Sequence, residues 1–171
     1  MGIGIGGAIE KWGPLLLENG DISLAPNIPK RKLRNAMRTY GRPHATPENT
    51  LLLIDNTLLR SAKDGLIITP THLLGRSGPG GVVSIPLVDI VSVLPDLRSL
   101  AGFPLPGIII NSEYFIALPG VVRTLDSVEY PAIYALVIML IQALGLELPS
   151  PEFDPDFNKA AADFNKGDFN K

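Results

Sequence analysis

The sequence predicts an α+β domain in which short antiparallel strands form a bent barrel or sandwich capped by one C-terminal helix. Three observations predict it. Short aliphatic runs bounded by turn residues fill the segment 51–118. A nearly continuous apolar run follows at 132–146, and residues 30–40 space their apolar side chains as a helix does. The expected order is therefore an extra N-terminal helix, a run of strands and a closing helix.

Size and composition fit one folded domain with two extensions. The chain has 171 residues, of which 46% are hydrophobic and 19% charged, so it has enough apolar side chains for a core. We expect an N-terminal arm at 1–29, a domain at 30–148 that includes the helix at its start, and a low-complexity tail at 149–171.

Composition also excludes several kinds of chemistry. The chain has no cysteine, which rules out disulfides, thiol nucleophiles and cysteine-bound metal. A net charge of −2 gives no general reason to expect a nucleic-acid partner. The opening MGIGIGGAIEKWG has no features of a secretory signal or transit peptide, so we expect a cytoplasmic location.

The arm at 1–29 shows no sustained apolar period. It is rich in Gly, Pro and Asn, and its apolar patch at Trp12 and 15–17 predicts an irregular segment that packs Trp12 on the body. Gly2, Gly4 and Gly7 match the G-x-G-x-x-G string. That motif binds phosphate only between a strand and a helix, and only Met precedes Gly2, so we expect no cofactor.

A short amphipathic helix is expected at about 30–40. Leu33, Ala36, Met37 and Tyr40 recur at spacings of three and four, and Gly41 follows as a stop signal. These side chains should face the body of the domain.

The same helix carries the main charge anomaly, because no acidic residue occurs between Asp21 and Glu48. The residues expected to contact an anionic partner are Lys30, Arg31, Arg34, Arg38 and Arg42. A solvated face that meets acidic groups of a partner or of the tail is one reading, and an anionic-lipid footprint is another. A nucleic-acid partner is not expected, because no aromatic residues alternate with the basic residues to stack on bases.

The strands begin with a hairpin. A strand at 51–59, a turn at 60–65 and a second strand at 66–76 interrupted by Pro70 are expected, followed by a flexible link. The next strand should run over 82–94, with Pro86 marking a bend or an edge.

Two further strands complete the predicted series. After a turn at 103–107, residues 107–111 and 113–120 read as strands joined at Asn111 and Ser112.

The apolar run at 132–146 predicts a buried helix. Asp126 and Glu129 suit a capping box. Pro131 belongs to the first turn or marks the true start of the helix, and a stop is expected around Gly145 or Pro149. At fifteen residues the run is shorter than the roughly 20 that a membrane span needs.

This helix is apolar on more than one side, so its second side must also be covered. The arm around Trp12 is one possible cover and a second subunit is the other. We expect self-association or a protein partner here, with an interface formed by Tyr134, Ile138 and Met139.

The tail repeats Asp-Phe-Asn-Lys three times, from Asp156, Asp163 and Asp168. Phe157 and Phe164 are seven residues apart, so they would share one side of a docked helix and join the protein interface. A flexible linker is the alternative.

No catalytic residue and no metal ligand is predicted. The only histidines, His44 and His72, have no partner in a nucleophile or metal-ligand spacing. Around the first hairpin, Asp55 and Thr57 suit hydrogen bonding at a strand end, and Asp64 suits a turn.

Two segments resemble a known family. IPLVDIVSVLP at 85–95 and IDNTLLRSAKDGLIIT at 54–69 are similar to strands of pleckstrin-homology-like or GRAM-like domains of the small bacterial type, and the resemblance spans about 50–145. It implies binding of a protein surface, a peptide or a membrane lipid, without catalysis. The basic pattern of inositol phosphate binders is missing, because the region offers only Arg60 and Lys63 beside Asp64.

The sequence thus predicts a non-enzymatic protein-binding or assembly module. A peripheral domain that binds anionic lipid through 30–42 is the alternative. A small hydrolase or nucleotide-binding enzyme is a third reading, and it lacks the catalytic spacings described above.

Overall fold

The computed structural model describes residues 2–76, 81–150 and 152–166. Its helices are α1 (Ile5–Leu16), α2 (Lys30–Ala36), α3 (Ala132–Leu144) and α4 (Pro155–Asn165), and a π-helical turn, η1 (Met37–Gly41), continues α2. Two 3₁₀ turns are η3 (Leu87–Asp89) and η4 (Pro119–Val122). The strands are β1 (Ile22–Leu24), β2 (Leu52–Asp55), β3 (Gly65–Ile68), β4 (His72–Arg76), β5 (Val82–Pro86), β6 (Val93–Leu100), β7 (Phe103–Ile110) and β8 (Tyr114–Ala117).

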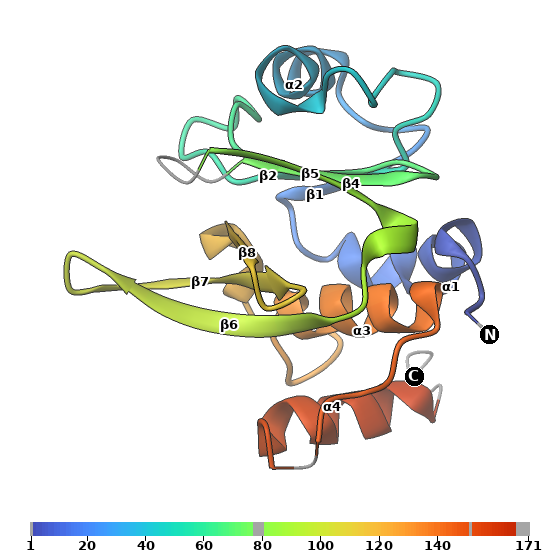
Figure 1. The fold of residues 1–171 in the computed structure, drawn as a ribbon, viewed down its shortest axis with the longest axis vertical. Coiled ribbons are helices and arrows are strands. Elements are labelled where there is room, and N and C mark those ends of the chain that lie inside the picture. The colour runs from blue at the N-terminus through green and yellow to red at the C-terminus, as the bar shows by residue number, and fades with distance from the viewer. Residues whose placement is uncertain (1, 77–80, 151, 167–171) are drawn as a thin grey trace.

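The strands form two antiparallel sheets, which confirms the α+β class. One sheet has the order β1-β2-β3-β4-β5 and the other the order β6-β7-β8. Within the described ranges the two sheets do not close into a barrel. Figure 1 shows α2 on one face of the five-stranded sheet, with α1, α3 and the three-stranded sheet on the other face and α4 beyond them.

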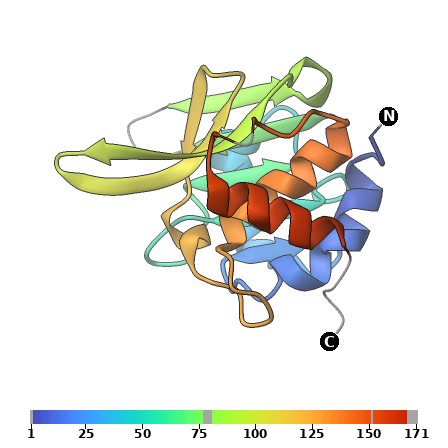
Figure 2. The same ribbon diagram turned by 90° about the horizontal axis from the view of Figure 1, so that it is seen from below.

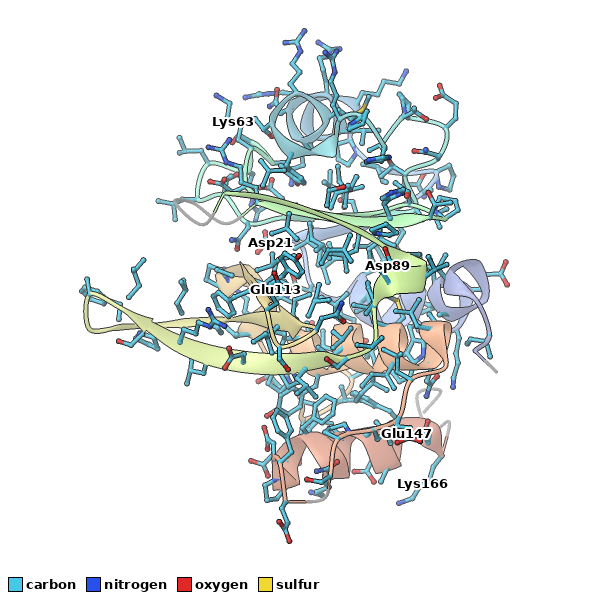
Figure 3. All side chains as sticks on the ribbon, viewed as in Figure 1. Asp21, Lys63, Asp89, Glu113, Glu147 and Lys166 are labelled. Carbon is cyan, nitrogen blue, oxygen red and sulfur yellow. The ribbon has the colours of Figure 1, made fainter. Side chains whose placement is uncertain are left out.

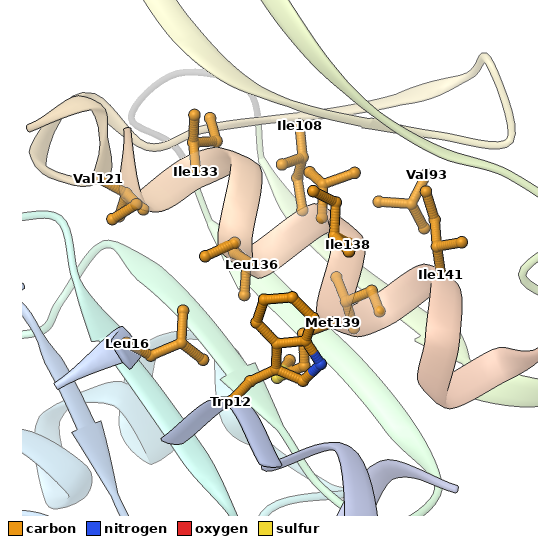
Figure 4. Packing of buried hydrophobic residues seen from close by; sticks show 14 of the residues in the cluster. Trp12, Leu16, Val93, Ile108, Val121, Ile133, Leu136, Ile138, Met139 and Ile141 are labelled. Carbon is orange, nitrogen blue, oxygen red and sulfur yellow. The ribbon is translucent and has the colours of Figure 1, made fainter. Parts of the chain in front are cut away.

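The main core surrounds α3. Trp12 and Leu16 of α1 pack on one side of this helix, and Val93 and Ile108 of the three-stranded sheet lie on another (Figure 4). Helix α4 covers a further side (Figure 2). Because α3 is enclosed in this way, nearly all of its side chains are apolar, and it ends at Gly145 in the left-handed conformation.

A smaller core seats α2 on the other face of the five-stranded sheet. Ala36 and Tyr40 pack there against Leu53, Ile67 and Leu74. The helix expected at 30–40 is thus confirmed as α2 and η1, with the expected side chains facing the body.

Several predicted boundaries were wrong. The segment 66–76 is two strands, β3 and β4, because the Thr69 hydroxyl accepts a hydrogen bond from the His72 backbone N–H at 2.9 Å and closes a turn around Pro70. The segment 82–94 also divides, since η3 follows Pro86. The predicted turn at 103–107 belongs to β7, and the chain reverses before it at Ala101 and Gly102.

Both ends of the chain are more regular than predicted. The arm holds α1 and β1, where an irregular segment was expected. Pro131 occupies the N-cap position of α3, so the capping box expected at Asp126 is wrong. In the tail, the first two repeats form α4, and the Asp154 side chain caps it by accepting from the N–H groups of Asp156 and Phe157. The third repeat, from Asp168, lies outside the described residues.

Over the described ranges, α1 to α4 are all too short or too polar to cross a membrane.

Candidate functional site

A groove with basic walls lies along α2 and η1, and we call it the α2 groove. Its volume is about 420 Å³. Its lining residues are Lys30, Leu33, Arg34, Met37, Arg38, Arg42 and Pro47. In Figure 3, nitrogen-tipped side chains project from this helix away from the sheet.

Local sequence explains how the groove is built. Pro29 precedes α2 in an extended conformation, and its carbonyl accepts the first helical hydrogen bond, from Leu33 N–H at 3.0 Å. At the other end, Arg42 is extended and stops the π-helical turn. Such turns are rare and occur often at functional sites. The following loop then brings Pro47 back to line the groove.

Polar anchors fix the opposite side of α2 to the sheet. The Lys32 ammonium lies 2.9 Å from Asp55 Oδ2, and the Asn35 amide donates to the Ser61 carbonyl at 2.8 Å. Lys32 and Asn35 therefore hold one side of the helix against the loop after β2. The side chains that line the groove lie away from these anchors.

Asp55 is the centre of this anchor. It is 2% exposed and accepts hydrogen bonds from the Thr57 N–H, the Thr57 hydroxyl and the Ala62 N–H at 3.0, 2.6 and 3.0 Å. Burial raises the pKa of Asp55, but the Thr57 hydroxyl, the Lys32 ammonium and the two N–H groups outweigh burial and lower it below its usual range. Asp55 and Thr57 thus have the structural role expected of them.

Among the residues that the structure describes, the cations of the groove have no carboxylate partner. The ion pairs found in the described ranges use other cations, namely Lys32, Arg60, Arg76, Arg98 and Lys166.

Lys30, Arg34, Arg38 and Arg42 are all exposed. Leu33 is 6% exposed and forms an apolar part of the lining. The arrangement suits a ligand that carries several negative charges and an apolar group.

Four of the five expected anionic contacts line this groove. Arg31 is exposed on the same helix but does not line it. Pro47 also lines it, which could not be predicted from sequence because its position depends on how the loop after η1 folds back.

The expected protein interface is occupied by the chain itself. Ile138, Met139 and Phe157 are 0% exposed and Phe164 is 1% exposed. Tyr134 is partly buried. The second side of α3 did need a cover, and α4 provides it together with α1, so these side chains are not available to a partner in this conformation.

Aromatic and polar contacts hold α4 in place. Phe157 packs edge-on against Tyr134 with ring centroids 5.2 Å apart, and Phe164 packs edge-on against Trp12 at the same distance. The Tyr134 hydroxyl donates to Asp154 at 2.8 Å, and the Tyr130 hydroxyl donates to Asp163 at 2.7 Å. Burial, followed by the hydrogen bond to Asp163, raises the pKa of Tyr130 to about 12.

The two histidines form a pair that the sequence did not predict. His44 and His72 stack with ring centroids 3.8 Å apart and planes 13° apart. Burial and the neighbouring His44 lower the pKa of His72, against an opposing effect of Asp89. No sequence spacing could have indicated this pair, because the residues come from a loop and from β4.

Of the glycine string, Gly2 and Gly4 lie beside the end of α3, and Gly7 lies within α1. Ile3 and Gly4 donate their N–H groups to the Gln142 and Ala143 carbonyls at 3.2 Å, and Gly4 caps α1. In the part of the chain that the structure covers, no three His, Asp or Glu side chains gather closely enough to hold a metal ion.

Comparisons with protein-family models, with curated proteins and with solved structures returned no match to this chain.

Proposed function

We propose that the chain is a non-catalytic binding module that docks an acidic protein segment in the α2 groove. The observation that carries the proposal is a set of four exposed cations, none of which pairs with a carboxylate among the described residues, around an apolar lining. Electrostatic complementarity of this kind speeds encounter and selects partners by charge. A segment that combines Asp or Glu with one large apolar side chain matches both parts of the groove.

The shape of the site favours a peptide over a bilayer. Leu33 is 6% exposed and Met37 is partly buried, so the apolar surface is recessed between the cations. No large apolar side chain between 18 and 57 is exposed, whereas helices that lie on membranes present theirs to the lipid. A flat lipid surface would meet the charges and leave the apolar lining uncovered.

The fold supports a pleckstrin-homology-like assignment as part of the same proposal. After β1, the chain forms four strands in one sheet and three in the next, and then α3. A run of short antiparallel strands followed by an apolar helix supports the resemblance, and α4 is an addition to it. The absence of catalysis and the cytoplasmic location stay predictions from the sequence.

Fluorescence anisotropy with a short labelled peptide of Glu and Leu tests the proposal. We expect saturable binding that weakens as salt is added, because salt screens exposed charges. Arg34→Glu with Arg38→Glu should weaken binding at least about tenfold, which corresponds to about 1.4 kcal/mol. A peptide with Gln in place of Glu should not bind.

Arg31→Glu is the matched control for Arg34→Glu alone, because each reverses one charge on the same helix and only Arg34 lines the groove. The Arg31→Glu variant should retain most of the affinity. Equal losses in both variants would mean that net charge and not the groove governs binding, and would overturn the proposal. Binding to phosphatidylglycerol vesicles but not to the peptide would assign the site to lipid instead.

A further inference from the structure

The hairpin of β6 and β7 extends beyond the body of the molecule (Figures 1 and 2). Its tip turns at Ala101 and Gly102, both with positive φ. Large apolar side chains are exposed along it: Leu97 is 68%, Leu100 is 54% and Phe103 is 75% exposed. Strand β6 is at the edge of its sheet, since the strand order is β6-β7-β8. Exposed edges of this kind are sites for pairing with another strand.

The hydrogen-bonding pattern shows which backbone groups of β6 point away from β7. In an antiparallel ladder, a residue directs its N–H and C=O to one side and its neighbours direct theirs to the other. The Pro106 carbonyl accepts from Leu118 N–H at 2.8 Å, so Pro106 faces β8. Leu97 is the register partner of Pro106, and its backbone groups therefore point away from β7. Ser99 follows the same pattern, and Pro95 contributes only its carbonyl.

One acidic and one basic side chain lie at equal distances along β6 on either side of Leu97. Asp96 and Arg98 flank it, share one face of the hairpin and form an ion pair at 3.0 Å. The Arg98 guanidinium also lies over the Phe115 ring, 4.3 Å from its centroid. An antiparallel second β6 centred on Leu97 would place its Arg98 opposite Asp96 and its Asp96 opposite Arg98.

We infer that two copies of the chain pair antiparallel through β6 about a twofold axis at Leu97, forming one continuous six-stranded sheet. Other registers fail on charge or hydrogen bonding. A parallel pairing in register sets like charges opposite each other. Centring on Pro95 places residues without an N–H opposite each other, and centring on Ser99 leaves Asp96 without an opposite Arg98.

The paired edge gains backbone and side-chain contacts. Each Leu97 N–H donates to the Leu97 carbonyl of the second copy, and each Ser99 N–H donates to the Pro95 carbonyl of the second copy. On the face that holds the charges, Leu94 comes opposite Leu100 of the second copy, which covers an exposed apolar side chain. The dimer also presents two α2 grooves to a partner.

The test is the mass in solution over a range of concentrations, by sedimentation velocity or light scattering. We expect the wild type to move toward twice the chain mass of 18.3 kDa as concentration rises. Asp96→Arg alone and Arg98→Asp alone should each weaken the dimer at least about tenfold, because each sets like charges opposite one another.

A mixture of the two variants is the decisive experiment. Asp96→Arg has two cations and Arg98→Asp has two anions, so they should pair with each other although neither retains the ion pair within its own chain. Leu97→Pro should also remove the dimer while leaving the β7 ladder intact, because the Leu97 N–H points outward.

Three results would overturn the inference. The first is a wild type that stays monomeric at every concentration. The second is single charge variants that dimerise as the wild type does, which would place the interface elsewhere. The third is a mixture that does not restore the dimer. Circular dichroism of each variant checks that it remains folded.

Discussion

Lys32 lies on α2 but does not line the α2 groove. Its ammonium is committed to Asp55, which is buried beneath the helix. Removing one partner of a buried ion pair leaves the other charge without compensation. We expect Lys32→Met to lower the free energy of unfolding by about 3 kcal/mol.

The control for this change is Arg60→Ala. Its guanidinium lies 4.0 Å from Asp21 and is 64% exposed, so its loss should cost little. Urea unfolding at neutral pH measures both variants. Equal stability of Lys32→Met and Arg60→Ala would show that the ion pair between Lys32 and Asp55 does not stabilise the packing of α2.

The stacked histidines should make stability depend on pH. The folded-state pKa of His72 is lowered, so the folded protein binds fewer protons than the unfolded chain. Stability from this site is therefore complete above the ordinary histidine pKa of about 6.5 and is lost as pH falls below it.

We expect His44→Gln to flatten this dependence, because it removes the charge that disfavours protonation of His72. Urea midpoints measured above and below the ordinary histidine pKa test it. The same slope in wild type and variant would mean that the pair is not coupled in solution.

At the scale of elements, α4 stabilises the apolar helix α3. Phe157 is 0% exposed, whereas Phe153 is 41% exposed just before the helix. Truncating a buried phenylalanine costs about 3–5 kcal/mol through lost burial and a residual cavity. We expect that loss for Phe157→Ala and about 1 kcal/mol or less for Phe153→Ala. Similar urea midpoints for the two variants would contradict the docking of α4.

Periodic segments were predictable and segments defined by tertiary contact were not. The apolar run of α3 and the spacing of Leu33 and Tyr40 in α2 identified both helices from sequence alone. Helix α1 was missed because Gly6, Gly7 and Pro14 mask its pattern, although its Trp12 side packs on α3. The expected interface on α3 failed for a related reason, since composition shows that a face needs a cover but not which segment supplies it.

The same limit applies to the candidate sites. The basic residues from Lys30 to Arg42 predicted the walls of the groove, because a run of basic residues without acidic neighbours can be read from the sequence. The recessed lining, Pro47 and the outward backbone groups of Leu97 required the folded chain. Edge strands in particular are defined by strand order and not by composition.

At the scale of the whole molecule, the arm and tail do not behave as separate extensions. Side chains from α1 and α4 belong to one core with α3 and both sheets, and Trp12 meets Phe164 across it. The α2 groove is exposed on one face and the β6–β7 hairpin at one side (Figures 1 and 3). A dimer formed through β6 would offer two grooves, and linked sites raise avidity without new contacts.

The most direct test of the binding function is a titration of isotope-labelled protein with the Glu and Leu peptide, followed by backbone amide NMR. The proposed site requires the largest shift changes within 30–47, and much smaller changes in the Arg34→Glu and Arg38→Glu double variant at the same peptide concentration. Changes centred on another segment, such as the exposed Leu58 and Leu59, or an unaltered response of the double variant, would contradict the assignment of the α2 groove.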